Sequence, residues 1–136
     1  MKTAPSFALG DFEIYSKLDL AIRSAGKVYI YDFKTGKPTG EEADQVGCYA
    51  LYATHRWACG PEGVGCYIVS LFPEFRQVAY PVTAESLAAL SNSIRESYAA
   101  MKALVNEGNV AVEEDFAKRD DDRACAWCNF AELCKG

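Results

Sequence analysis

Three charged residues, Asp19, Asp32 and Lys34, are of types and at a spacing that suit hydrolysis of a phosphate ester. Asp19 precedes the turn Ser24-Ala25-Gly26, and Asp32 and Lys34 follow it. In a hairpin closed by Ala25-Gly26, residues whose numbers sum to about 51 face one another, so Asp19 lies opposite Asp32. Lys34 then projects from the same face of the strand as Asp32. Facing carboxylates destabilise a sheet, and a divalent cation between them is one reason to keep them.

This trio has two interpretations on spacing alone. A hard cation such as Mg²⁺ takes one or two carboxylates, completes its shell with water and leaves room for a phosphate. The metal lowers the pKa of its water, while the Lys34 ammonium orients the nucleophile or stabilises the transition state. The alternative is a surface hairpin in which Asp32 and Lys34 form an ordinary ion pair.

A polar stripe on the following segment favours the first interpretation. Gln45, Tyr49, Tyr52 and Arg56 are spaced so that they share one face of a helix. An amide, two phenols and a guanidinium suit a nucleic-acid backbone, because they supply hydrogen bonds, a stacking surface and a charge. The alternative is an amphipathic helix whose tyrosines only pack, and it has more weight for Tyr52 and Arg56 than for Gln45 and Tyr49.

The elements that must position these residues follow from hydrophobic periodicity and turn signals. The pattern predicts an α/β domain in the order β-β-α-β-β-α, with a mixed sheet. The second strand is apolar on both faces and is therefore expected to be central. Thr39 and Thr83 are the expected helix N-caps, the former in a capping box with Glu42. The expected strands are 11–23, 27–34, 64–71 and 75–82, and the expected helices run to about 58 and from 84 to 106.

Length and composition favour a single domain, residues 1–136, with an α/β core over 11–106 and a cysteine-rich tail over 120–136. A net charge of −5 argues against unspecific attraction to nucleic acid, although it leaves room for an acidic metal site. Membrane spans need roughly 20 consecutive apolar residues, and we expect none here. The first residues make a poor signal peptide, so we expect a cytoplasmic protein.

The six cysteines fall into two groups. Cys125, Cys128 and Cys134 have the spacing C-x2-C-x5-C, which suits zinc or an iron–sulfur cluster equally well. Three unligated thiols are the alternative. The other group, Cys48, Cys59 and Cys66, is scattered, and free cysteines of that kind are usually buried as small hydrophobic residues.

The segments SKLDLAI, YIYDFKTGK and QVGCY together resemble the PD-(D/E)xK nuclease superfamily, in particular its RecB-like branch. That branch includes the RecB and AddB nuclease domains and RecB-like CRISPR-associated exonucleases. The resemblance covers roughly residues 16–49 and implies a restriction-endonuclease-like sandwich. It implies that Asp19, Asp32 and the main-chain carbonyl of Phe33 hold Mg²⁺ or Mn²⁺, and that Lys34 is the catalytic lysine.

The same resemblance assigns Gln45 and Tyr49 to the Gln-x-x-x-Tyr element, which helps to hold DNA. It also implies that the tail cysteines ligate a 4Fe–4S cluster together with one upstream cysteine. The family's first helix, which carries that cysteine, is absent from this chain, since about ten residues precede the first expected strand. We therefore expect a fragment, a degenerate relative, or a chain completed by a partner that supplies this helix.

The expected function is a divalent-metal-dependent DNA nuclease, acting as an exonuclease on DNA ends, single-stranded DNA included, in recombination, repair or defence. The alternative is an inactive or truncated nuclease-like module that binds DNA or protein. An uncovered sheet face also predicts a homo-oligomer or a partner protein.

Overall fold

The computed structural model describes residues 5–36, 42–112, 114 and 122–129. Within it the chain divides into two compact units, Met1–Ser97 and Tyr98–Gly136. The candidate residues Asp19, Asp32, Lys34, Gln45 and Tyr49 lie in the first unit. The helices of the described residues do not combine the length with the apolar composition that a membrane span requires.

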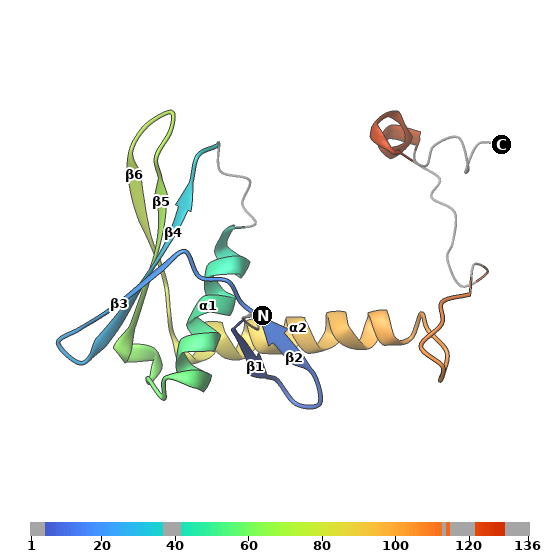
Figure 1. Ribbon diagram of the computed structural model, residues 1–136, viewed down its shortest axis with the longest axis horizontal. Coiled ribbons are helices and arrows are strands. Elements are labelled where there is room, and N and C mark those ends of the chain that lie inside the picture. The colour runs from blue at the N-terminus through green and yellow to red at the C-terminus, as the bar shows by residue number, and fades with distance from the viewer. Residues whose placement is uncertain (1–4, 37–41, 113, 115–121, 130–136) are drawn as a thin grey trace. The chain divides into compact units, whose positions relative to one another are not determined.

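The first unit is a mixed α/β structure (Figure 1). A short hairpin of β1 and β2 is followed by a larger sheet in the order β3-β4-β5-β6. Strands β3 and β4 are antiparallel, β4 and β5 parallel, and β5 and β6 antiparallel. The strands are β1 (Ser6–Ala8), β2 (Glu13–Tyr15), β3 (Leu20–Ser24), β4 (Lys27–Lys34), β5 (Val64–Ser70) and β6 (Arg76–Tyr80), and the helices are α1 (Glu42–Arg56), η1 (Pro61–Gly63) and α2 (Ala84–Lys102).

The predicted hairpin is present in the predicted register. Ser24 pairs with Lys27, and Leu20 pairs with Tyr31. Ala25 and Gly26 both have positive φ, 49° and 77°. This is the conformation of a two-residue turn whose twist matches that of the flanking strands.

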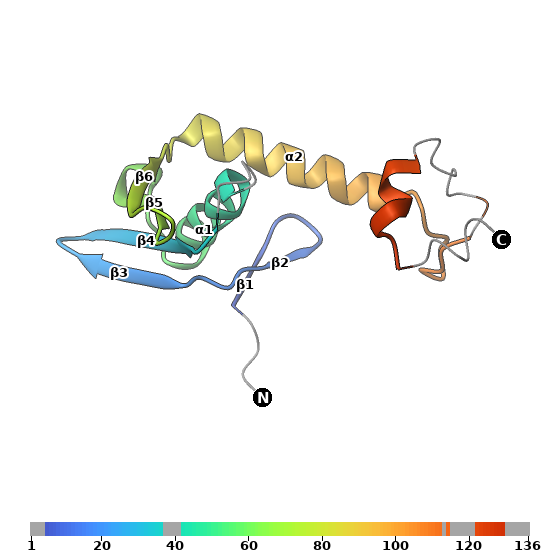
Figure 2. The same ribbon diagram turned by 90° about the horizontal axis from the view of Figure 1, so that it is seen from above.

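Strand β4 is central, as its apolar residues on both faces predict. Its inward residues Val28, Ile30 and Asp32 are almost fully buried. Because parallel strands need a long crossover, α1 connects β4 to β5 and packs on one face of the sheet (Figure 2). Gly47 of α1 lies against Leu90 of α2, so the first turns of α2 pack on α1. The buried cluster comprises Phe7, Leu9, Val28, Ile30, Val46, Tyr49, Ala50, Leu51, Ala53, Val64, Cys66 and Leu87.

The prediction of one strand over residues 11–23 is wrong. The chain leaves β2 at Tyr15 and does not re-enter a strand until Leu20. Strand β2 pairs with β1, which periodicity did not predict, so the segment between β2 and β3 passes from one sheet to the other. The two parts of the expected strand therefore differ in burial: Ile14 packs against the core, whereas Leu20 and Ile22 are exposed.

Helix α2 begins where its sequence predicts. Thr83 and Ser86 exchange hydrogen bonds of 3.0 Å between side-chain hydroxyls and backbone N–H groups, a reciprocal cap. The helix ends at Lys102 rather than near 106, and Met101 is 58 % exposed. The capping box expected at Thr39 lies outside the described residues.

In the second unit, Val105 and Ala111 form an isolated antiparallel bridge. A 3₁₀ helix, η3, spans Asp122–Trp127.

Candidate active site

The carboxyl end of β4 places the candidate residues. Asp32 is on the face covered by α1 and is 1 % exposed, and Lys34, two residues further, projects to the same side. Burying a carboxylate is costly unless it is paired or binds a metal. The position of Asp32 at the edge of the core is therefore a functional signal.

Asp19 approaches β4 from the neighbouring chain segment. It occupies a bend directly before β3, next to the pair Leu20–Tyr31, so the register brings it beside Asp32. Its Oδ2 accepts a hydrogen bond of 3.0 Å from the backbone N–H of Phe33. The two carboxylates thus meet at one end of the hairpin, as the sequence predicts.

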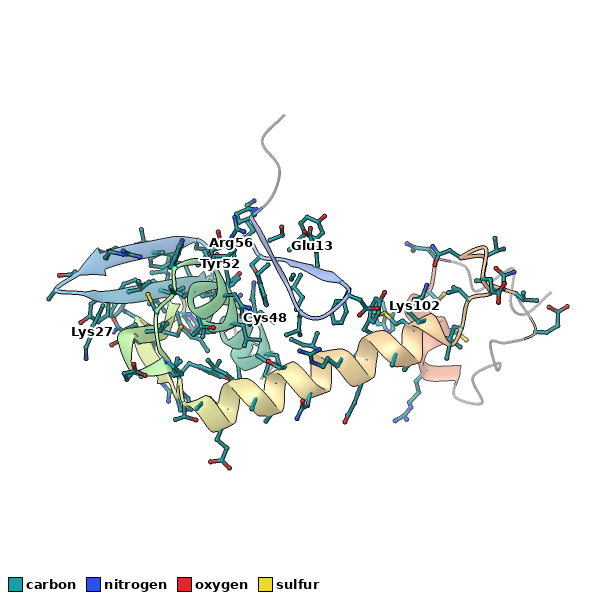
Figure 3. All side chains as sticks on the ribbon, turned by 90° about the horizontal axis from the view of Figure 1, so that it is seen from below. Glu13, Lys27, Cys48, Tyr52, Arg56 and Lys102 are labelled. Atoms are coloured by element: carbon teal, nitrogen blue, oxygen red, sulfur yellow. The ribbon has the colours of Figure 1, made fainter. Side chains whose placement is uncertain are left out.

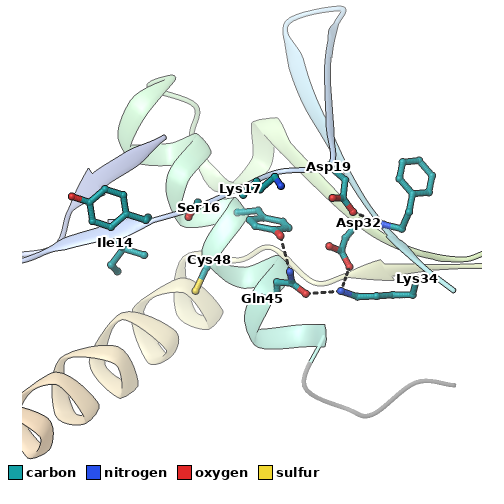
Figure 4. Close-up of a pocket in the computed structure, with 11 residues that line it drawn as sticks. Ile14, Ser16, Lys17, Asp19, Asp32, Lys34, Gln45 and Cys48 are labelled. Carbon is teal, nitrogen blue, oxygen red and sulfur yellow. Dashed lines mark hydrogen bonds and ion pairs between the residues drawn. The ribbon is translucent and has the colours of Figure 1, made fainter. Parts of the chain in front are cut away.

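Lys34 connects the strand to α1 (Figure 4). Its Nζ lies 2.8 Å from Oδ2 of Asp32 and donates a hydrogen bond of 2.6 Å to Oε1 of Gln45. The amide Nε2 of Gln45 in turn donates to the hydroxyl of Tyr49 at 2.8 Å. A continuous polar chain therefore runs from a buried tyrosine through an amide and an ammonium to a buried carboxylate.

The electrostatics of this chain keep Lys34 charged. Hydrogen bonding and charge attraction from Asp32 raise the pKa of Lys34 above its ordinary value, against the opposing effect of burial. Burial, followed by the charge of Asp32, raises the pKa of Tyr49, so its phenol stays protonated. Oδ2 of Asp32 is buried, and among the described residues its main compensation is the Lys34 ammonium, 2.8 Å away.

These groups line an open cleft with a volume of about 520 Å³. Sequence reasoning missed several of its lining residues, among them Ser16, Lys17 and Cys48 (Figure 4). Lys17 precedes Asp19 by two residues, so an extended segment puts both on one side, and this spacing was a usable signal. The full lining is Ile14, Tyr15, Ser16, Lys17, Asp19, Asp32, Phe33, Lys34, Gln45, Cys48 and Tyr49.

Tyr52 and Arg56, the other half of the expected stripe, do not line the cleft. Tyr52 packs edge-on against Phe7 and Trp57, with ring centroids 6.3 and 5.2 Å apart. Arg56 is exposed at the end of α1 (Figure 3), roughly 16 Å along the helix from Gln45 at 1.5 Å per residue. The structure therefore brings Gln45 and Tyr49 to the carboxylates and leaves the later pair away from them.

The tail cysteines are only partly within the described residues. Cys125 is half-buried and Cys128 is exposed, while Cys134 lies outside the described residues. Across the described ranges, no three His, Cys, Asp or Glu side chains gather in a group that would hold a metal by themselves. Cys66 is a core residue, as expected, and burial raises its pKa to about 12.

The model of the PD-(D/E)XK nuclease superfamily matches residues 2–135. The chain belongs to this superfamily. Comparisons with curated proteins and with solved structures returned no match. The mixed sheet flanked by helices agrees with the restriction-endonuclease-like fold of the superfamily. Membership indicates metal-dependent nuclease activity on DNA, usually with Mg²⁺.

The cleft residues fit such a metal. Two carboxylates, those of Asp19 and Asp32, approach from adjacent segments and line the same cleft. Oxygen ligands of this kind, supplemented by water, are what Mg²⁺ and Mn²⁺ take in proteins. A bound divalent ion supplies a water of lowered pKa and neutralises charge at the phosphate.

Proposed function

We propose that this chain is a divalent-metal-dependent deoxyribonuclease of the RecB-like branch, acting on DNA ends. The observation that carries the proposal is the buried Asp32 carboxylate, which meets Asp19 on one side and the Lys34 ammonium on the other, inside an open cleft. Carboxylates that face each other at the end of a hairpin destabilise the sheet unless they bind a cation.

In this proposal Asp19 and Asp32 hold the metal, aided by the main-chain carbonyl of Phe33. The backbone N–H of Leu71 donates to the carbonyl of Lys34 at 2.8 Å, so that carbonyl points toward β5. Successive carbonyls alternate along a strand, and the Phe33 carbonyl therefore points to the Asp19 side, where the Phe33 N–H is bound.

Lys34 has the role of a charged group rather than a base. Its raised pKa keeps it as an ammonium, which orients the attacking water or stabilises the charge that develops on the phosphate. Gln45 positions this ammonium through its 2.6 Å hydrogen bond, and Tyr49 orients the Gln45 amide. Both also lie in the cleft, where they can contact a DNA strand.

An exonuclease is favoured over a sequence-specific endonuclease. Reading of base sequence relies on hydrogen bonds and apolar contacts to base edges. The charged groups of the cleft lining, Lys17, Lys34 and the two aspartates, instead suit phosphate and metal.

The test is cleavage of end-labelled linear DNA with Mn²⁺, by the wild-type protein and by Asp32→Ala. Asp11→Ala, which removes an exposed aspartate away from the cleft, is the matched control. We expect cleavage by the wild type and the control and none by Asp32→Ala. Covalently closed circular DNA should survive. Cleavage that persists in Asp32→Ala contradicts the proposed site, and rapid cutting of circles contradicts the exonuclease assignment.

For the tail we propose a 4Fe–4S cluster on Cys125, Cys128 and Cys134, with zinc as the alternative. The backbone N–H of Cys128 bonds to the carbonyl of Cys125 at 3.4 Å at the end of η3. Residues three apart in a 3₁₀ turn share one side, which suits two ligands of one metal centre. A cytoplasmic location would keep these thiols reduced. Anaerobic purification followed by iron, sulfide and zinc analysis tests this.

One exposed face of the sheet supports a protein-binding role in addition to catalysis. The sheet face away from α1 exposes Leu20, Ile22 and Phe33 by 39–45 %. Exposed apolar patches of this kind mark protein interfaces, so we propose that this face meets a partner or a second copy of the chain. Light scattering over a range of concentrations tests self-association, and a strictly monomeric species contradicts the second-copy form.

A further inference from the structure

The loop between β5 and β6 exposes more apolar surface than a short hairpin connection needs. Residues 71–75 are all exposed, with Leu71 at 49 %, Phe72 at 66 % and Phe75 at 73 %. Two phenyl rings in water are unfavourable unless something covers them when the protein works. Nothing in the catalytic proposal uses them.

This loop begins directly beside the catalytic end of β4. Lys34 pairs with Ser70, and Ser70 pairs with Arg76, so the three residues form one row across the sheet. The hydrogen bond from Leu71 N–H to the Lys34 carbonyl continues the ladder into the loop. Figure 1 shows the β5–β6 connection at the same end of the sheet as the end of β4.

The row also carries positive charge. Arg76 is exposed, and its guanidinium makes no ion pair with the described residues. A hollow of about 180 Å³ beside the row is lined by Lys34, Glu42, Ile68, Ser70, Arg76 and Val78. The ammonium of Lys34 is already paired with Asp32, so Arg76 is the cation of this hollow that is available to a ligand. Adjacent strands lie about 4.8 Å apart, so Arg76 is about 10 Å from Lys34 and suits a different phosphate of the same strand.

We propose that the β5–β6 hairpin is a single-strand binding subsite of the nuclease: Phe72 and Phe75 stack on bases, and Arg76, assisted by Ser70, binds a backbone phosphate beside the catalytic cleft. Base faces are available for stacking in single-stranded nucleic acid and are covered in a duplex, so the subsite selects single strands and frayed ends. This inference rests on the proposed nuclease function and assigns its substrate class.

The row of Lys34, Ser70 and Arg76 favours nucleic acid over a protein or a membrane as the ligand of this hairpin. It joins the aromatic loop to the cleft without interruption, as a backbone threaded into the site requires. Aromatic rings combined with a positively charged track are the usual means of holding single strands without sequence preference.

The experiment measures fluorescence anisotropy of a labelled oligo(dT) and of a blunt-ended duplex, over a range of salt concentrations. All proteins carry Asp32→Asn and are assayed without added metal, so that no cleavage interferes. We expect Phe72→Ala with Phe75→Ala to weaken oligo(dT) binding by about fivefold or more, at an unchanged salt slope. Duplex binding should change less than about twofold. Arg76→Ala should lower the salt slope by about 0.7 on the single strand.

The matched control is Arg23→Ala with Met101→Ala, which removes an exposed arginine near the turn of the β3–β4 hairpin and an exposed apolar residue of α2. It should bind oligo(dT) as the parent does. If the parent binds no DNA, the proposed nuclease function is contradicted, and the subsite proposal that rests on it is contradicted as well. If the parent binds and the phenylalanine pair changes nothing, or weakens single strand and duplex equally, the subsite assignment is overturned.

Discussion

Replacing Lys34 by methionine should destabilise the metal-free protein, because it leaves the Asp32 carboxylate buried without its partner. Removal of one partner from a fully buried pair costs about 3–5 kcal/mol, whereas exposed pairs contribute about 0–1 kcal/mol. The Asp32 side chain is 2 % exposed and that of Lys34 27 %. The pair lies between these limits, and we expect a loss of about 2 kcal/mol.

The assay is urea unfolding in the presence of a chelator, followed by circular dichroism. The midpoint should fall at an unchanged slope. Lys27→Met is the matched control, because Lys27 is an exposed residue at the other end of the same strand (Figure 3); it should change stability by less than about 0.5 kcal/mol.

A double-mutant cycle isolates the pair. In an Asp32→Asn background the buried charge is gone, so Lys34→Met should cost much less, with a coupling of about 1–2 kcal/mol. If Lys34→Met costs the same in both backgrounds, or is neutral in the wild type, the ammonium does not compensate Asp32 and our account of the site is wrong.

Three further predictions follow from the same contacts. Mn²⁺ should bind Lys34→Met more tightly than the wild type, by up to about tenfold in titration calorimetry, because the metal no longer displaces an ammonium from Asp32. Equal or weaker binding would show that the metal and the ammonium do not compete for Asp32. Tyr49→Phe removes the hydroxyl that accepts from Gln45. We therefore expect a loss of about 0.5–1.5 kcal/mol in unfolding and slower cleavage; unchanged turnover would exclude an orienting role. The pKa of Lys34 is raised above 10.5 in the folded state. The difference in unfolding free energy between wild type and Lys34→Met should therefore be full below about pH 10 and shrink as the pH rises through the folded-state pKa. A difference that grows with pH would contradict the direction of this pKa shift.

The sequence by itself determined the local parts of this site. The Ala25-Gly26 turn and period-two alternation set the register of the hairpin, and Ser24 pairs with Lys27 as expected. A register slip would turn every side chain to the other face, so the pairing strongly constrains where Asp32 points. Spacing along one strand and one helix likewise placed Lys34 beside Asp32, and Gln45 beside Tyr49.

Contacts between segments that are distant in the chain were decided only by the tertiary structure. Alternation over 11–23 indicated one strand, but pairing with β1 draws residues 13–15 into a separate hairpin, and the break leaves Asp19 in a bend before β3. Helical spacing grouped Tyr52 with Gln45, yet Tyr52 packs on Phe7 of β1, a strand that the alternation pattern did not predict.

The bond from Lys34 to Gln45 and the row from Lys34 through Ser70 to Arg76 also needed the fold. Both depend on the parallel pairing of β4 and β5 across the α1 crossover, in which residues more than thirty positions apart become neighbours. Periodicity records which face of an element is apolar, but not which other element covers it. The types and spacings of the candidate catalytic residues are therefore local properties of the sequence, whereas their assembly into one cleft is a property of the packed sheet and helix.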